Sequence, residues 1–282
     1  LFIDYSAQIG SSISLKLGIR GDYFSYSRSV RVSPRFSAAF RINDRARISF
    51  AVGYFRQTLP LLLLYQNPDN RTLTEPLAYQ YSAGLDYRFS ESVKLKVSGY
   101  YKDYRHLPLD PSQPSLCLLD DMFGFSLFRD MALSDQGRGA SYGIEMTLQK
   151  KMKKGFYGMV NASLFRTRYR DLAGKWHARA FDNRFLFSAQ GGIKLGVHWD
   201  ISLKMSVAGG RPYTPFNESL STELNSAVFD FSRVNEKRLP IYQRLDIRVD
   251  RRFYFNKTNL TVYLSVWNLY NRKNVARYYW NE

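Results

Sequence analysis

The sequence predicts an all-β protein, an antiparallel up-and-down β-barrel that spans a membrane. Three observations predict this fold: apolar and polar residues alternate along most of the chain, the alternating segments are about 10 to 15 residues long, and short connections alternate with long ones. Successive strand side chains point to opposite faces, so alternation gives each strand one apolar and one polar face. Soluble strands average about five or six residues, whereas a tilted membrane-crossing strand needs about 9–11.

About a dozen segments carry this alternation. In the first clear one, every odd position from Ile13 to Ile19 is apolar, and the positions between are polar or small. No stretch predicts a convincing amphipathic helix. The alternating segments, in chain order, are 13–23, 36–42, 48–54, 81–89, 93–101, 142–148, 156–164, 185–195, 199–207, 245–255 and 260–266.

The connections sort by length along the chain. An outer-membrane barrel has short periplasmic turns on one rim and longer extracellular loops on the other, whereas a soluble sandwich has no reason to sort its loops in this way. Aromatic residues cluster at strand ends, as expected at the two membrane interfaces. Short turns at 10–12, 43–45, 90–92, 151–154, 196–198 and 256–258 alternate with longer links around 27–31, 59–76, 107–138, 171–181 and 211–240.

The composition excludes several other classes of protein. Of 282 residues, 45% are hydrophobic and 16% are aromatic, which excludes a disordered chain. Cys117 is the only cysteine, so the chain is not a disulfide scaffold. The longest apolar stretch, Leu59 to Tyr65, contains Pro60 and is far shorter than the roughly 20 residues of a membrane-spanning helix. The net charge of +17 recurs on alternate strand positions instead of forming one patch, which argues against a nucleic-acid partner.

The chain lacks the residue patterns of an enzyme. Its three histidines have no metal-ligand spacing, and there is no cysteine cluster, phosphate-binding glycine loop or nucleophile elbow. Outer-membrane phospholipases are barrels of about twelve strands, but they carry a His and a Ser on the lipid-facing side of one strand. His106 is predicted at the start of a loop and His198 beside a short turn. We therefore expect no catalytic residue, no metal site and no cofactor.

Three motifs toward the C-terminus are the most specific features of the sequence. They are Gly-Arg-Pro-Tyr-Thr-Pro at 210–215, Arg-Leu-Pro at 238–240 followed by Tyr-Gln-Arg-Leu-Asp at 242–246, and Asn-Leu-Tyr-Asn-Arg-Lys-Asn at 268–274. With these motifs, in this order and spacing, the chain resembles the barrel of TonB-dependent outer-membrane receptors, especially the type common in Bacteroidetes. The resemblance covers nearly the whole chain and concerns the C-terminal half of the barrel.

The resemblance also sets expectations for the rest of such a protein. Family members carry an N-terminal plug domain and a TonB-binding segment, have about 22 strands, and end on a strand with an aromatic last residue. We expect residues 1–282 to be a partial barrel domain with about 12 of about 22 strands, lacking the plug domain and the final strand.

The resemblance implies TonB-dependent active transport of a scarce solute across the outer membrane. The C-terminal motif looks less like the glycan-importing subclass, which favours a siderophore-like or other metal chelate. The implied partners are TonB with its inner-membrane energising complex, reached through the plug, the small-molecule ligand, and outer-membrane lipid and lipopolysaccharide. The alternative is a complete small outer-membrane barrel that acts as a passive channel or an adhesin.

Two sets of residues are candidates for function. Aromatic or basic side chains in the three longest links are candidate substrate contacts, with loop packing as the alternative role: Tyr65, Phe123, Phe125, Phe128, Arg211, Tyr213 and Phe216. Charged residues at polar strand positions are expected to face the lumen and the plug: Lys16, Arg20, Arg41, Asp86, Lys94, Lys96, Glu145, Lys204, Asp246 and Arg248.

Overall fold

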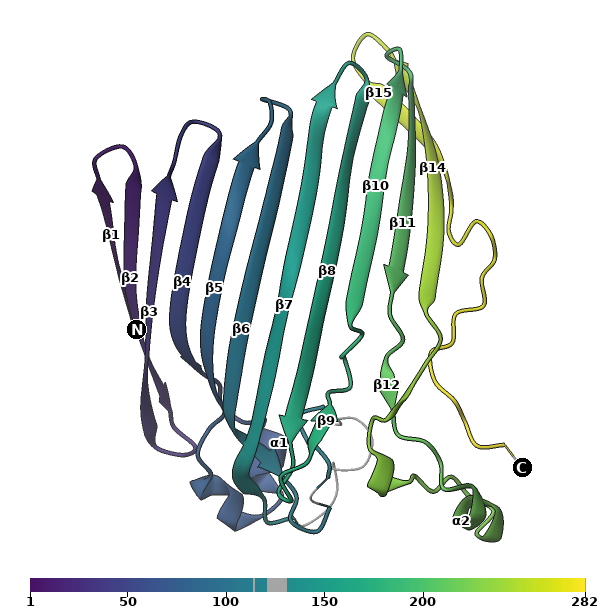
Figure 1. Cartoon of the computed structure of the whole chain (residues 1–282). Helices are drawn as coiled ribbons and strands as arrows, with labels where there is room; N and C mark the ends of the chain where they lie inside the picture. Colours follow the sequence, from purple (N-terminus) through teal and green to yellow (C-terminus); the bar gives the residue numbers. More distant parts are fainter. Residues whose placement is uncertain (114, 121–130, 282) are drawn as a thin grey trace.

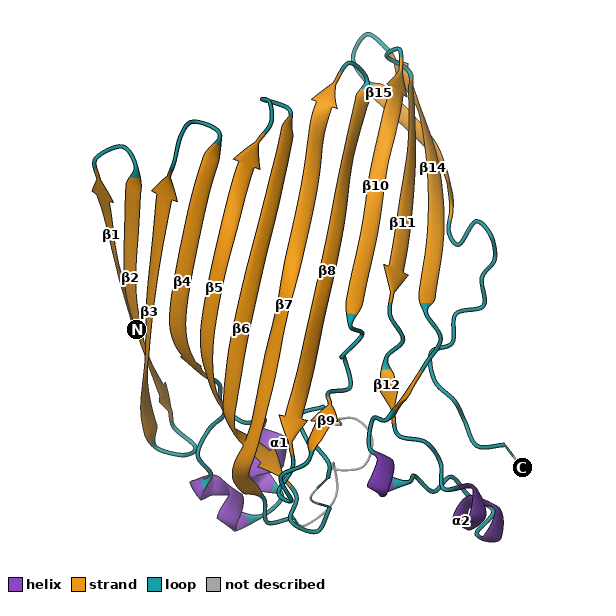
Figure 2. Cartoon of the chain, in the orientation of Figure 1, coloured by secondary structure: helices purple, strands orange, loops and turns teal. Residues whose placement is uncertain are grey.

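The computed structural model describes residues 1–113, 115–120 and 131–281, and it consists almost entirely of one curved antiparallel sheet (Figures 1 and 2). This sheet has thirteen strands, twelve of them in chain order, with β9 paired to β8 beside that path. Its members are β1 (Phe2–Ile9), β2 (Ile13–Phe24), β3 (Ser29–Arg41), β4 (Ala46–Arg56), β5 (Leu77–Arg88), β6 (Val93–Leu109), β7 (Ser134–Lys153), β8 (Phe156–Arg170), β9 (Trp176–Ala178), β10 (Phe185–Leu195), β11 (Trp199–Ala208), β14 (Tyr242–Tyr254) and β15 (Asn259–Val266).

The predicted sorting of connections by length is largely confirmed. The short turns lie at one rim of the sheet and the long connections at the other, at the top and bottom of Figure 1. We call the long connections the outer loops. They contain the small sheet of β12 (Pro212–Tyr213) and β13 (Lys237–Arg238) and four short helical segments: α1 (Leu61–Tyr65), η1 (Pro68–Thr72), α2 (Glu218–Glu223) and η2 (Phe231–Arg233).

Two local predictions are wrong. The link expected around 27–31 is only the four-residue turn 25–28, because the pairing of β2 with β3 continues to Phe24 and Ser29. His106 does not begin a loop but lies inside β6, where the register with β7 shifts between Arg105 and Leu107. The positive φ of His106, 57°, fits this irregularity.

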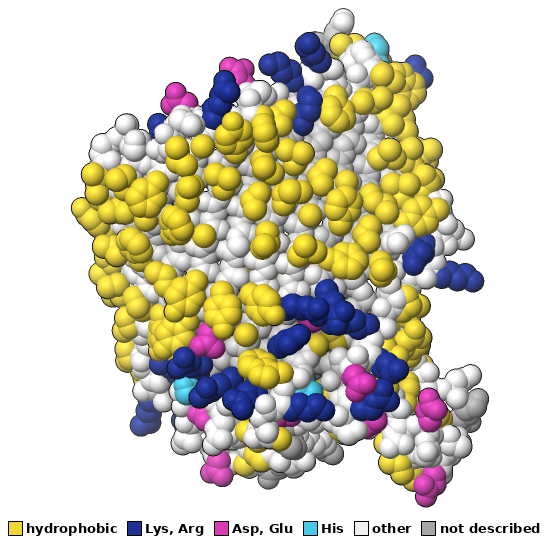
Figure 3. All heavy atoms as spheres, viewed as in Figure 1, with side chains coloured by type: hydrophobic (Ala, Val, Ile, Leu, Met, Phe, Trp, Pro, Cys, Tyr) yellow, Lys and Arg dark blue, Asp and Glu magenta, His cyan; other side chains and the backbone are white. Residues whose placement is uncertain are grey.

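The two faces of the sheet differ as the alternation predicts. Large apolar side chains stay exposed along one face, among them Ile144 at 60%, Leu164 at 65% and Leu264 at 68%. An exposed apolar face of this size is stable only against lipid or another apolar surface. Figure 3 shows it as a broad apolar band across the strands.

Much of the tightly buried packing lies beneath the outer loops. Leu107, Leu109, Cys117 and Tyr169 form one buried cluster there. A second buried cluster is built from Leu63, Leu118 and Met131. The outer loops are therefore a packed layer on the end of the sheet. Within the described ranges, no helix is both long enough and apolar enough to cross a membrane.

Candidate functional site: lumen wall and outer loops

All ten charged residues predicted to face the lumen lie on one face of the sheet, opposite the apolar band. The cross-strand register shows this directly, since Lys94 of β6 lies opposite Gln149 of β7 and Lys204 of β11 lies opposite Asp246 of β14. Each residue shares its face with the polar positions of the neighbouring strands. The ten are Lys16, Arg20, Arg41, Asp86, Lys94, Lys96, Glu145, Lys204, Asp246 and Arg248. Their contact with a plug domain stays a prediction.

Several of these charges pair with a carboxylate on the same face. Lys94 Nζ lies 3.0 Å from Asp86 Oδ1, across β6 and β5. Arg20 pairs with Asp22 at 2.8 Å, two positions along the same strand. These pairs are largely exposed, so solvent screens them and they contribute little to stability. They hold the long side chains in place along the wall.

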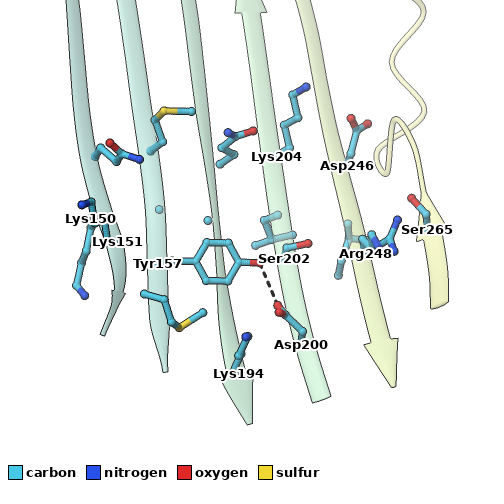
Figure 4. A pocket seen from close by; sticks show the side chains of 18 of the residues that line it. Lys150, Lys151, Tyr157, Lys194, Asp200, Ser202, Lys204, Asp246, Arg248 and Ser265 are labelled. Atoms are coloured by element: carbon cyan, nitrogen blue, oxygen red, sulfur yellow. Dashed lines mark hydrogen bonds between the residues drawn. The ribbon is translucent and has the colours of Figure 1, made fainter. Parts of the chain in front are cut away.

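A groove of about 890 Å³ runs along this face over β7, β8, β10, β11, β14 and β15 (Figure 4). The Tyr157 hydroxyl donates a hydrogen bond to Asp200 Oδ1 at 3.0 Å. Arg248 lies 2.6 Å from Asp250 and stacks on the Tyr263 ring, with its guanidinium carbon 4.0 Å from the ring centre. The charged and polar side chains along this groove suit polar contact with a partner in the lumen or with a passing solute.

The outer loops form a second concavity, with a volume of about 280 Å³. Three of the predicted substrate contacts, Arg211, Tyr213 and Phe216, meet there. They all come from the connection between β11 and β14, which β12 and β13 fasten into a hairpin. We call this concavity the outer pocket.

Aromatic rings from distant parts of the chain complete the outer pocket. The Tyr213 and Tyr278 rings are 5.2 Å apart, and the Phe216 and Phe229 rings are 5.0 Å apart. Burial, and then the negative charge that Tyr278 carries when ionised, raise the pKa of the Tyr213 hydroxyl. The hydroxyl is therefore a neutral donor at physiological pH. Aromatic walls with a few polar groups are typical of small-molecule sites.

The Gly-Arg-Pro motif has a specific steric role at this pocket. A Cβ on Gly209 would collide with the carbonyl oxygen of Asn183, and one on Gly210 would collide with that of Leu239. Only glycine permits this close backbone approach. The adjoining Arg211 is thereby held with its guanidinium 4.8 Å from the centre of the Phe181 ring.

Buried ion pairs tie the outer loops together, and sequence reasoning missed them. Asp182, 1% exposed, lies 2.6 Å from Arg238 and 3.8 Å from Arg166. Arg179 forms an ion pair with Asp120 from the loop between β6 and β7. Polar residues in loops show no periodicity, so no sequence signal distinguishes these pairs from solvated charges.

His177 is part of the same loop packing. Its Nε2 lies 2.7 Å from Asp171 Oδ2, and its ring stacks on Tyr169 with centres 5.3 Å apart. Burial opposes ionisation of Asp171, but hydrogen bonds from His177 and from the Lys175 N–H outweigh it and lower the pKa of this carboxyl. The Tyr169 hydroxyl donates to the Ser115 carbonyl oxygen. The histidine thus has a structural contact on each side.

The remaining candidates do not join the outer pocket. Tyr65 ends α1 with 81% of its surface exposed, and it is not among the residues that line the pocket. Phe123, Phe125 and Phe128 lie outside the described residues. Across the described ranges, no group of three or more His, Cys, Asp and Glu side chains is placed to hold a metal ion.

A meandering sheet with one lipid-facing and one charged face, short turns at one rim and packed loops at the other, defines the wall of an outer-membrane β-barrel. The chain belongs to the TonB-dependent receptor family, because the family model described as "TonB dependent receptor-like, beta-barrel" matches residues 1–269. Its location is therefore the outer membrane, and the family consists of receptors and transporters, not enzymes.

Solved structures of several receptors and transporters share this fold. The outer membrane transporter YddB from Escherichia coli aligns with a TM-score of 0.70 at 12% identity, over 97% of this chain and 41% of that one. The ferric-catecholate import receptor Fiu from E. coli aligns with a TM-score of 0.69 at 11% identity, over 98% and 40%. The FrpB iron transporter from Neisseria meningitidis aligns with a TM-score of 0.67 at 13% identity, over 96% and 40%.

The chain spans about two fifths of the length of these structures. A search of the curated proteins found no match.

Proposed function

We propose that the protein containing this chain is an active, TonB-dependent transporter that carries a metal chelate across the outer membrane. The observation that carries this proposal is the match of the barrel model over residues 1–269. In this proposal, residues 1–282 are a partial barrel domain that supplies part of the lumen wall and several substrate-recognition loops. TonB and the inner-membrane energising complex act through a plug domain, which contacts the charged face of the sheet. Outer-membrane lipid and lipopolysaccharide surround the apolar face.

An iron chelate of the siderophore type is the substrate class that we favour. The structurally similar FrpB is described as an iron transporter and Fiu as a ferric-catecholate import receptor. The outer pocket offers a cation at Arg211 beside the rings of Tyr213 and Phe216. Flat, oxygen-rich chelates that carry negative charge suit contacts of this kind, through ring stacking and charge-assisted hydrogen bonds. Contacts of these three residues with the substrate are part of the proposal.

Uptake of radiolabelled iron chelates by cells that express the full-length protein tests the transport function. We expect saturable uptake that stops when a protonophore collapses the inner-membrane proton gradient or when TonB is deleted. A passive channel would continue to conduct under both treatments, which would contradict the proposal.

Variants of the outer pocket test the recognition residues separately. Tyr213→Ala and Arg211→Ala are each expected to weaken chelate binding by roughly tenfold, the usual cost of losing an aromatic or arginine anchor. Phe255→Ala removes an exposed aromatic residue in the β14–β15 turn, at the opposite rim of the sheet, and serves as the matched control. Equal effects of Tyr213→Ala and Phe255→Ala would show that the outer pocket does not recognise the substrate, and the transport assignment would be unaffected.

A further inference from the structure

The lipid-facing side of β6, β7 and β8 ends in a group of arginines next to the outer loops. Arg105 of β6 lies opposite Arg138 of β7, and Arg138 lies opposite Arg170 of β8. Directly opposed side chains on an antiparallel sheet have Cβ atoms about 4.5–5.5 Å apart, and like charges at such positions are destabilising. Three arginines in one row are therefore an unfavourable arrangement for the chain alone.

Two more arginines extend this row toward the membrane. Arg168 and Arg166 follow on the same face of β8, and the next residue on that face is the exposed Leu164. Arg166 lies opposite Tyr142, whose ring stacks on that of Tyr101 with centres 6.5 Å apart. Tyrosines at the margin of an apolar face mark the membrane–water interface. The basic residues thus begin where the apolar band ends. We call Arg105, Arg138, Arg166, Arg168 and Arg170 the arginine block.

Figure 3 shows Lys and Arg side chains gathered along the margin of the apolar band that faces the outer loops. The backbone of Arg184 adjoins the arginine block, since its carbonyl oxygen accepts a hydrogen bond of 2.8 Å from the Phe165 N–H. Loss of hydration, followed by the positive charges of Arg238 and Arg166, lowers the pKa of Arg184. Positive charge is therefore concentrated at this margin.

The chain itself neutralises only part of this charge. Arg105 pairs with Asp103 at 3.1 Å, and Arg166 lies 3.8 Å from Asp182. Arg170 Nε donates to the carbonyl oxygen of Gly174 at 3.0 Å, which leaves its charge in place. Over the described ranges, neither Arg138 nor Arg168 forms an ion pair or a side-chain hydrogen bond, and both side chains are exposed. These guanidinium groups remain available for an external anion.

We propose that the arginine block binds the phosphate groups of lipopolysaccharide in the outer leaflet. The block lies on the lipid-facing surface, at the rim of the long extracellular loops, so the lipid beside it is that of the outer leaflet. Guanidinium groups form bidentate, charge-assisted bonds with phosphate. The adjoining apolar band receives the acyl chains while the arginines hold the headgroup. This inference depends on the outer-membrane location of the chain and not on the transported substrate.

Binding of purified lipid A to the full-length receptor in detergent tests the proposal, with native mass spectrometry as the readout. The probes are diphosphorylated lipid A and the same lipid after removal of both phosphates. We expect the phosphorylated lipid to bind at least about tenfold more tightly. Equal binding of the two lipids would overturn the proposal and would mean that acyl contacts alone hold the lipid.

A pair of triple variants locates the site. Arg138→Gln/Arg168→Gln/Arg170→Gln is expected to weaken binding of diphosphorylated lipid A at least about tenfold, and the corresponding Lys variant is expected to retain most of it. The matched control is Lys151→Gln/Lys153→Gln/Lys154→Gln, which removes the same charge from the opposite rim of the same hairpin. Equal losses in the two Gln variants would overturn the assignment of the site.

A single substitution covers the case in which the triple variant fails to fold. Arg168→Gln removes no ion pair or side-chain hydrogen bond within the described chain, so the barrel should assemble normally. We expect it to weaken lipid A binding severalfold, and unchanged binding would count against the arginine block. Chelate uptake by the same variant should be unaffected. A defect in lipid binding is therefore distinguishable from a defect in transport.

Discussion

Asp182 and Arg238 form an ion pair of 2.6 Å that joins two outer loops across 56 residues of sequence. Asp182 Oδ1 also accepts a hydrogen bond of 2.8 Å from the Thr167 N–H at the end of β8. One carboxylate therefore fixes β8, the β8–β10 connection and the hairpin that carries Tyr213 relative to one another. The geometry of the outer pocket depends on this junction.

Replacing this carboxylate should loosen the outer loops. Asp182→Asn leaves Arg238 partly buried without its counter-ion, and breaking a buried pair in this way costs about 3–5 kcal/mol. Arg238 keeps a fifth of its side chain exposed, so we expect the lower end of that range. Hydrogen exchange of the backbone at 209–241 measures the effect. Arg233→Gln breaks the exposed pair with Glu236 and should change exchange much less, because solvent screens that pair. A similar effect of both variants would contradict this assignment.

The contact between Asp171 and His177 should make the β8–β10 loop sensitive to acid. The folded state lowers the pKa of Asp171, so this carboxylate stabilises the loop above its unfolded pKa of about 4. That stabilisation is lost as the pH falls below about 4, through the folded pKa. Hydrogen exchange at 171–178 should therefore accelerate below this pH. Asp171→Asn should exchange faster at neutral pH and show less acceleration in acid, and an unchanged profile would refute the role of this group.

The single thiol should be inert in the folded protein. Burial, followed by the negative charge of Asp120, raises the pKa of Cys117 to about 12, and only 3% of its surface is exposed. Because the thiolate is the reactive form, labelling by a thiol reagent at pH 8 should require denaturation. Tyr169→Phe removes the hydrogen bond to the Ser115 carbonyl oxygen and should accelerate labelling. Rapid labelling of the folded wild-type protein would show that this loop cluster is open in solution.

The two faces of β8 should respond differently to an added charge. Val160 shares the lipid-facing side with Leu164, whereas the next residue, Asn161, faces the lumen. Arginine on the lipid face near the bilayer midplane costs about 2–4 kcal/mol. We therefore expect Val160→Arg to reduce the free energy of unfolding, measured by urea denaturation, by that amount. Asn161→Arg should reduce it much less. Equal losses would mean that the faces are assigned wrongly.

Strands and their faces were predictable because the signal is local. A period of two is visible in a single strand such as 13–23, and it sets the direction of every side chain once the strand forms. Which side chains meet across neighbouring strands, such as Lys94 and Asp86, is decided by the register of the two strands. Deviations from regular pairing were not predictable in this way. The bulge at His106 and the tight turn at 25–28 depend on how far neighbouring strands continue to pair, which a single segment does not encode.

The candidate site was likewise predictable only in part from the sequence. Motif and loop position predicted Arg211, Tyr213 and Phe216 as candidates, and the structure places them in one pocket, but the sequence did not indicate their neighbours Tyr278 and Phe229. Contacts between loops join residues far apart in sequence and leave no periodic trace. The ion pair of Asp120 with Arg179 spans 59 residues, and each member alone looks like an ordinary solvated charge.

The sequence by itself determined that this protein is an antiparallel membrane sheet with one apolar and one charged face, because alternation is a property of consecutive residues. Only the tertiary structure decided which side chains meet between strands and between loops. The row of Arg105, Arg138 and Arg170 exists only through the register of three neighbouring strands. The packing of the outer loops likewise depends on buried charges such as Asp182. The partners of this carboxylate come from distant segments that fold into one layer.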